Sequence, residues 1–359
     1  MTFVGPMEGW FMRVEIFDVG HGHCAVITAP NGGRIMLDCG DRWGDDRFWT
    51  PSLHYFGQTI NLLGLLNLDE DHLSDFQGMI EDCKVSWLLT NPTIGAREFA
   101  DLKSDRMGSG AKAFARWLNA PKGMTGALQP DFGLVAIKWY YLRYSPCEVN
   151  TTNDLSLVVI VKFGAFKIVF AGDLEVSGWR RMLASPEFRR DLLGTNVFVA
   201  SHHGRESGCC TELFDWLHPE IVIISDDERQ YDSQDTDDWY RNRCIGAACI
   251  ANPSERRHVL TTRKDGSMRI DANADGRWNL LPITVRDWPR KPLPAPSLNL
   301  GLNALPPLGF GNNALAALLT PTPPPTGRLA GLGPRPYLND PLARALGLGA
   351  VPDPVPQKR

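Results

Sequence analysis

The sequence predicts an α+β fold in which two mixed β-sheets pack face to face and helices cover their outer surfaces. Short strand candidates are joined both by hairpin-like turns and by longer segments with helical periodicity, so antiparallel and crossover connections are both required. A chain of 359 residues with 43% hydrophobic content also has ample apolar side chains for a sizeable core. Two face-to-face sheets satisfy both observations.

The first part of the chain is expected to open as a meander and then to alternate between helices and strands. Strands are predicted at residues 13–18, 25–28 and 34–38, separated by glycine-rich turns. A helix at 73–82, a buried strand at 85–90 and a helix at 111–119 follow.

The second part repeats this alternation. Strands are predicted at residues 135–144, 155–161 and 167–170, with Phe163-Gly164-Ala165 as a hairpin turn. The expected elements after them are a helix at 176–183, a strand at 197–200, a helix at 211–217 and a strand at 221–225.

The composition divides the chain into a body, residues 1–290, and a tail, residues 291–359. The tail contains 15 of the 27 prolines, and proline removes backbone donors and favours extended segments. We expect it to be extended or disordered. A flexible extension, a strap over the body and a docking peptide for a protein partner remain open.

Charge and cysteine content exclude several classes of protein. The formal net charge of −4 argues against a nucleic-acid binder that uses a broad basic surface, but it leaves open a site where metal ions neutralise phosphate. The eight cysteines form no CxxC pair, so neither a zinc ribbon nor a disulfide framework is expected. We expect no secretory leader, no membrane insertion and a cytoplasmic location.

Candidate metal ligands follow three separate apolar runs. They lie in Asn67-Leu68-Asp69-Glu70-Asp71-His72, in Gly172-Asp173 and in Ser201-His202-His203-Gly204. A strand that ends in Asp or His delivers that side chain to the sheet edge, where the backbone can hold it against a cation. The first hypothesis is therefore a metallohydrolase.

These segments and several others, in the same order, resemble the metallo-β-lactamase superfamily and within it the hydrolase domain of ComEC-type DNA-uptake proteins. The resemblance spans roughly residues 13–280. Its motifs are Phe17 to His23, Leu37-Asp38-Cys39-Gly40, Asn67 to Asp75, Asn153 to Val158, Val169 to Asp173, His202-His203-Gly204, and Thr262 to Ser267 with Asp275-Gly276.

The resemblance implies an αββα sandwich with an active site on one edge. There, one or two divalent ions, Zn2+ or Mn2+, would be held by Asp69, Asp71, His72, Asp173 and His202 or His203. His202 is slightly favoured from the family's pattern. Two family histidines are missing, since Asn67 stands at one position and the other offers only Asp226, Asp227, Tyr231, Asp232 and Asp235.

We assign catalytic roles to Asp71, as proton acceptor, and to Asp173, as a carboxylate bridging two cations. N-capping of the following helices is the alternative for both. Asp18 and Asp38 are expected to brace ligands, with turn capping as the alternative. His21 and His23 are candidates to overhang the site, and the alternative, which is more frequent for loop histidines, is that they have no role. Further residues expected to line the site are Asn67, Asn153 and Asp232.

The sequence thus favours a hydrolase that uses a metal-activated water. Through the resemblance, the expected substrate is a phosphodiester in a nucleic acid or nucleotide. The alternative is a degenerate member of the fold that binds a partner without catalysis. The two missing histidines favour that alternative, whereas the retained carboxylates argue against it, because they would repel each other without a cation.

Overall fold

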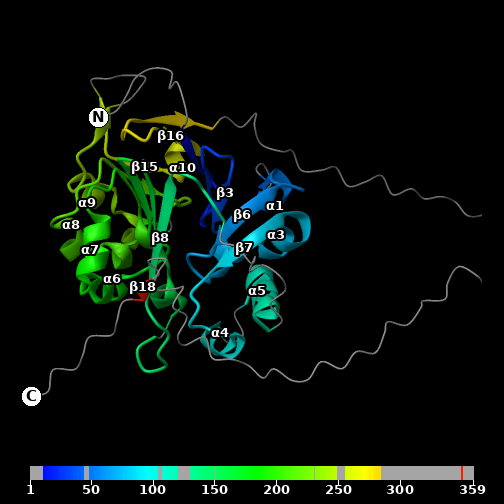
Figure 1. Ribbon diagram of the computed structural model, residues 1–359. Helices are drawn as coiled ribbons and strands as arrows, with labels where there is room; N and C mark the ends of the chain where they lie inside the picture. The colour runs from blue at the N-terminus through cyan, green and yellow to red at the C-terminus, as the bar shows by residue number, and fades with distance from the viewer. Residues whose placement is uncertain are drawn as a thin grey trace, which may run out of the picture.

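Two mixed sheets lie at the centre of the computed structural model, as the strand connections predicted (Figure 1). The structure describes residues 11–43, 48–103, 107–119, 130–149, 151–229, 231–248, 255–283 and 349–350. Within these residues the first sheet has seven strands, in the order β17 (Trp278–Pro282), β16 (Met268–Ala272), β1 (Met12–Ile16), β2 (Ala25–Thr28), β3 (Arg34–Leu37), β6 (Thr59–Gly64) and β7 (Lys84–Leu89).

The second sheet also has seven strands in the described part of the chain. Their order is β15 (Val259–Thr261), β12 (Ile221–Ile224), β11 (Val197–Val199), β10 (Phe166–Phe170), β9 (Val158–Phe163), β8 (Val135–Tyr141) and β18 (Gly349–Ala350). Two short ribbons pair β4 (Arg42–Trp43) with β5 (Phe48–Trp49), and β13 (Ala247–Ala248) with β14 (Arg256–Arg257).

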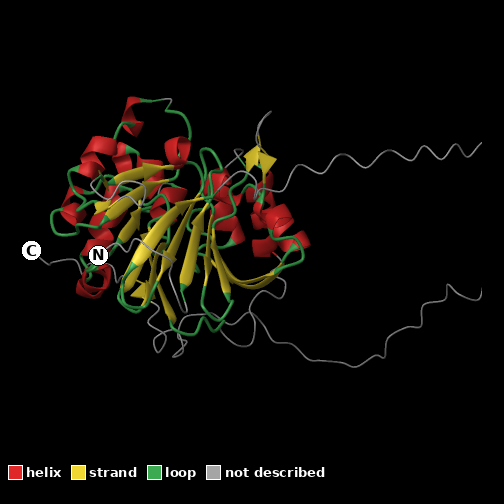
Figure 2. Ribbon diagram, turned by 90° about the horizontal axis from the view of Figure 1, so that it is seen from above, coloured by secondary structure: helices red, strands yellow, loops and turns green. Residues whose placement is uncertain are grey.

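Helices cover the outer face of each sheet (Figure 2). The first sheet is covered by α1 (Pro51–His54), α3 (Phe76–Asp82), α4 (Ala96–Lys103) and α5 (Ser109–Asn119), with α2 (Glu70–Leu73) at its edge. The second is covered by α6 (Val176–Leu183), α7 (Pro186–Leu192), α8 (Thr211–Phe214) and α9 (Asp237–Arg241). The short α10 (Thr262–Asp265) follows β15. The αββα arrangement is confirmed.

Three apolar layers hold this sandwich together. Successive side chains of β10 alternate between them: Phe166, Ile168 and Phe170 face the other sheet, whereas Val169 faces the helices. Successive side chains of a strand point to opposite faces of the sheet, and both faces of β10 are buried. On the far side, Phe76 and Phe114 pack helices against the first sheet.

Strand direction decides where the site forms. In the first sheet, β3 and β6 are parallel, and β1 runs in the same direction because β2 is antiparallel to both of its neighbours, β1 and β3. In the second sheet, β10, β11, β12 and β15 are parallel. The polar segments that follow these strands therefore collect at one edge of the sandwich.

Some predicted elements differ from the observed ones. The helix expected at 73–82 is present as α3, but it starts three residues later than expected, because α2 ends at Leu73 and α3 begins at Phe76. The Asp75 carboxylate between them accepts hydrogen bonds from the backbone and hydroxyl of Ser52, which favours a break there. The strand expected to start at 155 begins at Val158, after the 3-10 helix η1 (Thr152–Leu155).

The predicted tail lies outside the described residues apart from β18, which pairs in parallel with Tyr140 and Tyr141 of β8. Every helix within the described residues is too short or too polar to cross a bilayer.

The layer between the sheets gives a stability prediction. Ile168 is fully buried there, so Ile168→Ala should lower the free energy of unfolding by about 2–5 kcal/mol, measured by urea denaturation. The control is Lys162→Ala on neighbouring β9, where the side chain is exposed and a change within about 0.5 kcal/mol is expected. Equal effects of the two substitutions would contradict this packing.

Candidate metal centre

Four side chains from both sheets converge at the edge of the sandwich. Asp71 and His72 lie on α2 after β6, Asp173 follows β10, and His203 lies in the 3-10 helix η2 (Ser201–Gly204) after β11. One ligand-type atom from each lies within 4.8 Å of the others. We call these four residues the central cluster.

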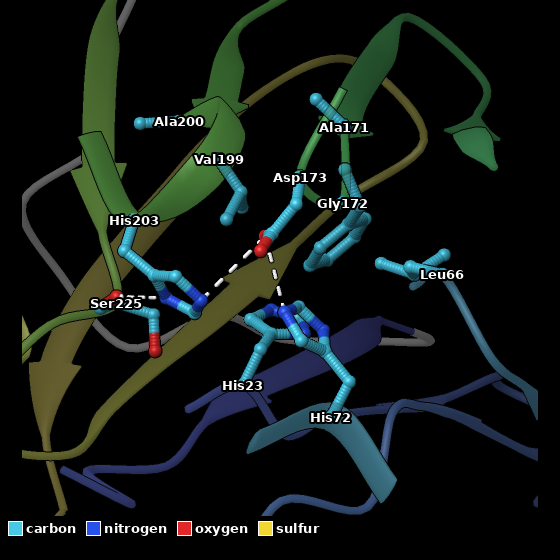
Figure 3. Close-up of a pocket in the computed structure, with 11 residues that line it drawn as sticks. His23, Leu66, His72, Ala171, Gly172, Asp173, Val199, Ala200, His203 and Ser225 are labelled. Carbon is cyan, nitrogen blue, oxygen red and sulfur yellow. Dashed lines mark hydrogen bonds and ion pairs between the residues drawn. The ribbon is translucent and has the colours of Figure 1, made fainter. Parts of the chain in front are cut away.

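Asp173 lies between the two imidazoles of the central cluster (Figure 3). Its Oδ1 is 3.0 Å from Nε2 of His72 and 3.5 Å from Nε2 of His203. Nε2 of His203 is also 3.2 Å from Oδ2 of Asp71. Both Nε2 atoms are buried, and neither has a well-aligned hydrogen bond within the described residues.

A small cavity opens against this cluster. It encloses about 10 Å³ and is lined by His72, Asp173 and His203 together with His23 and Ser225. That volume is about one water-sized sphere. Three imidazoles that line it, those of His23, His72 and His203, have an Nε2 atom without an aligned hydrogen bond, and Asp173 adds a carboxylate. These groups and this volume fit a single bound cation.

The Asp38 carboxylate orients two of the imidazoles. Its Oδ2 accepts hydrogen bonds from Nδ1 of His23 at 2.9 Å and of His72 at 2.8 Å, and its Oδ1 accepts one from the Leu66 backbone at 2.6 Å. With Nδ1 donating to Asp38, Nε2 is the ring nitrogen left to face the cavity, where its lone pair can bind a cation once the ring is neutral. Asp38 has a left-handed φ of 60°, which Asp tolerates better than most residues.

His203 is oriented in the same way from the second sheet. Its Nδ1 lies 2.8 Å from the Ser225 carbonyl oxygen, which can only accept, so this nitrogen must donate. Ser225 in turn donates from its hydroxyl to the Gly22 carbonyl at 2.7 Å, linking the second sheet to the first loop.

Close backbone packing positions Asp71. A Cβ at Gly40 would lie 2.4 Å from the Asp71 carbonyl oxygen, so only glycine fits there. The same carbonyl accepts a hydrogen bond from the His23 backbone at 3.3 Å. Asp71 is not an N-cap, because Asp69 occupies that position of α2, and Glu175 rather than Asp173 occupies the N-cap position of α6.

Opposite charges in the central cluster shift one another's pKa. Burial alone would lower the pKa of His72, but the carboxylates of Asp173 and Asp38 raise it well above its ordinary 6.5. Burial would raise the pKa of Asp173, but the imidazoles of His72 and His203 hold it well below its ordinary range. Asp71 shows the same downward shift for the same reasons.

One expected ligand, Asp69, and two residues expected to line the site, Asn67 and Asn153, contact other side chains. The side chain of Asp69 is 2.6 Å from the Thr152 hydroxyl and forms an ion pair with Lys103. Asn67 donates to Asn153 Oδ1 at 2.9 Å, and Asn153 donates to Glu175 at 3.2 Å. None of these side chains belongs to the central cluster.

The paired histidines point in different directions. Both have left-handed backbone conformations, with φ of 51° at His202 and 52° at His203. His203 faces the cavity, whereas Nδ1 of His202 lies 2.7 Å from the Ser207 hydroxyl and 3.4 Å from Glu175. The structure therefore places His203 in the cluster, although the sequence slightly favoured His202.

His21 lies over the cluster, as expected for a residue that overhangs the site. Its ring is 4.6 Å from that of His203, and its Nε2 accepts a hydrogen bond from Arg205 at 3.1 Å. Burial, followed by the nearby His203 and Arg205, lowers the pKa of His21 to about 4. A neutral His21 and a cationic Arg205 therefore flank the centre.

The remaining candidates brace loops or lie on the surface. Asp18 forms an ion pair with Arg42 and accepts from the Gly20 backbone at 3.3 Å, so it supports the first loop. Asp226, near the position of a missing histidine, forms a buried ion pair with Arg263. Asp232 is exposed in the 3-10 helix η4 (Asp232–Gln234).

Three residues that contact the candidate site residues, Lys103, Arg205 and Ser225, are not among those predicted from the sequence. The helical spacing of apolar residues at 96–103 could have indicated α4, but no local signal pairs Lys103 with Asp69, which is 34 positions away. Arg205 directly follows the His-His-Gly motif, and this adjacency is a signal that could have found it.

No protein-family model matches the sequence, and no curated protein matches it. Among solved structures, the chain is similar to CmlA, a diiron β-hydroxylase from Streptomyces venezuelae, at 11% identity and a TM-score of 0.42. That match covers 78% of this chain and 55% of the hydroxylase, so the chain spans about half of its length.

A second similar structure is a Thermotoga maritima protein assigned as a Zn-dependent hydrolase of the metallo-β-lactamase superfamily. The identity is 13%, the TM-score is 0.35, and the match covers 69% of this chain and 98% of the other. The fold described above rests on the strand order and layering of this chain.

The charge network gives a pH prediction for protein prepared with a chelator. The pKa of His72 is higher in the folded protein than its ordinary value of 6.5, so the protonated side chain stabilises the fold. This stabilisation is complete below pH 6.5 and is lost as the pH rises through the pKa of the folded state. The melting temperature should therefore fall from about pH 6 to about pH 9, and His72→Gln should flatten the slope. The exposed His218→Gln is the control and should leave the slope unchanged. His203, whose pKa is also raised by nearby carboxylates against the effect of burial, should keep part of the slope in His72→Gln, so an unreduced slope in that variant would contradict this assignment.

Proposed function

We propose that this protein is a metal-dependent hydrolase of the metallo-β-lactamase fold, with Asp71, His72, Asp173 and His203 as its metal ligands. The observation that supports it best is the convergence of two buried Nε2 atoms and two carboxylate oxygens within 4.8 Å of one another, beside an ion-sized cavity that His72, Asp173 and His203 line. Mixed imidazole and carboxylate ligands suit Zn2+ and Mn2+.

The surrounding residues would keep these ligands ready. Asp38 and the Ser225 carbonyl fix the ring tautomers of His72 and His203, so that both present Nε2 to the cation. A divalent cation bound there would lower the pKa of a water towards ~7 and neutralise negative charge that develops on the substrate.

We assign Asp71 the role of proton acceptor. Its side chain is 28% exposed, whereas that of Asp173 is 4% exposed, so Asp71 is the carboxylate that a water or substrate can reach. Its lowered pKa keeps it ionised at neutral pH, as a base must be.

A phosphodiester is the proposed substrate. The order of the sequence motifs supports it, and so does the positive charge of Arg205, which contacts His21 above the cluster. Cationic side chains beside a metal centre favour an anionic substrate. The competing proposal is a binding module without catalysis, and the loss of imidazoles at Asn67 and Asp226 favours it.

Metal content and one substitution test this function. Purified protein should carry a divalent metal by elemental analysis and hydrolyse bis-p-nitrophenyl phosphate. Asp173→Ala should reduce the rate by roughly 10³-fold or more, because it removes a central ligand. Asp232→Ala, a surface carboxylate, is the control and should retain activity. Protein without metal that neither Zn2+ nor Mn2+ restores would favour the binding module.

Asp38 offers a second test through its effect on the ligands. In Asp38→Asn the side chain keeps its shape, and asparagine also tolerates the left-handed backbone. A neutral amide oxygen, however, accepts the two hydrogen bonds from the imidazoles of His23 and His72 more weakly than a carboxylate oxygen does. We expect Zn2+ affinity to fall about 10–100-fold in competition with a chelating dye. Asp232→Asn is the matched control, and unchanged affinity in Asp38→Asn would refute the orienting role.

A further inference from the structure

Asp69, which precedes Asp71 of the central cluster by two residues, is held by two protein groups. Its Oδ1 accepts a hydrogen bond from the Thr152 hydroxyl at 2.6 Å and forms an ion pair with Nζ of Lys103. The Lys103 side chain is 12% exposed, so its ammonium is largely withdrawn from water. A buried ammonium needs a negative partner, and Asp69 supplies one.

Packing of α4 fixes Lys103 at this place. Phe99 of the same helix is fully buried and meets Phe114 of α5 edge to face, with ring centroids 5.3 Å apart. Lys103 is the last residue of α4, where a positive charge interacts favourably with the helix dipole. The lysine is thus directed towards Asp69 by an anchored helix.

The other groups near Asp69 are also already paired. Asn67 is fully buried, donates to Asn153 Oδ1 at 2.9 Å and accepts from the Leu68 backbone. Burial lowers the pKa of Lys103 to about 8, and the negative charge of Asp173 opposes that shift. Lys103 therefore interacts with two carboxylates, Asp69 by direct ion pairing and Asp173 through its charge.

We propose that the Lys103 ammonium takes the place of a second cation beside Asp69, so that the centre holds one metal ion and one fixed organic cation. This inference rests on the proposed function and specifies it. The charge of the Lys103 ammonium would neutralise the charge of Asp69 and part of the charge of Asp173 without a second metal ion. It would also add a second cationic group to the site where an anionic substrate binds.

Titration with Mn2+ tests the proposal, with stoichiometry from calorimetry and elemental analysis as the readouts. Wild-type protein should bind one equivalent. Lys103→Ala should bind two, because Asp69 becomes available to an ion. Lys103→Arg keeps the charge and should stay at one. The double variant Lys103→Ala/Asp69→Ala should return to one, which places the new ion at Asp69.

Each other outcome has a defined meaning. Two equivalents in wild type, or one in Lys103→Ala with an unchanged melting curve, would overturn the assignment of Lys103. If Lys103→Ala fails to fold, Lys103→Met is used in its place, because methionine keeps a long apolar side chain there. Two bound equivalents are expected for this variant as well. No binding by wild type would instead overturn the proposed function, so the two failures are distinguishable.

Discussion

The shared carboxylate of Asp38 is the interaction on which the candidate centre depends. One oxygen accepts from His23 and His72, and the other accepts from the backbone of Leu66. A single buried side chain therefore joins the first loop, the end of β3 and the segment after β6. Its negative charge is stable in the interior because two imidazoles and a backbone donor surround it.

The rest of the centre comes from the second sheet, so the site forms only when both sheets are packed. Asp173 and His203 reach the cavity from the ends of parallel strands, and Ser225 bonds both to His203 and to the first loop. The apolar layer between the sheets therefore sets the distance between the two halves of the ligand set. Stability of the core and geometry of the site are linked for this reason.

Charge balance explains why so many ionisable groups can be buried at one edge. The carboxylates of Asp71 and Asp173 meet imidazoles, Asp69 meets Lys103, and Asp226 meets Arg263. Each pair offsets part of the cost of removing charge from water. The central cluster differs from the structural pairs around it because four ligand-type atoms of two carboxylates and two imidazoles converge within 4.8 Å of one another.

The sequence by itself determined the layers, most strand positions and the segments that supply the site, because apolar periodicity and strand-end polar residues are local signals. It placed Asp71, His72, Asp173 and the His202-His203 pair in motifs. Only the tertiary structure decided which of these side chains meet. His203 rather than His202 faces the cavity because both adopt left-handed backbone conformations, which an extended strand would not predict. Asp69 meets Lys103, because contacts between residues far apart in sequence depend on how helix and sheet pack.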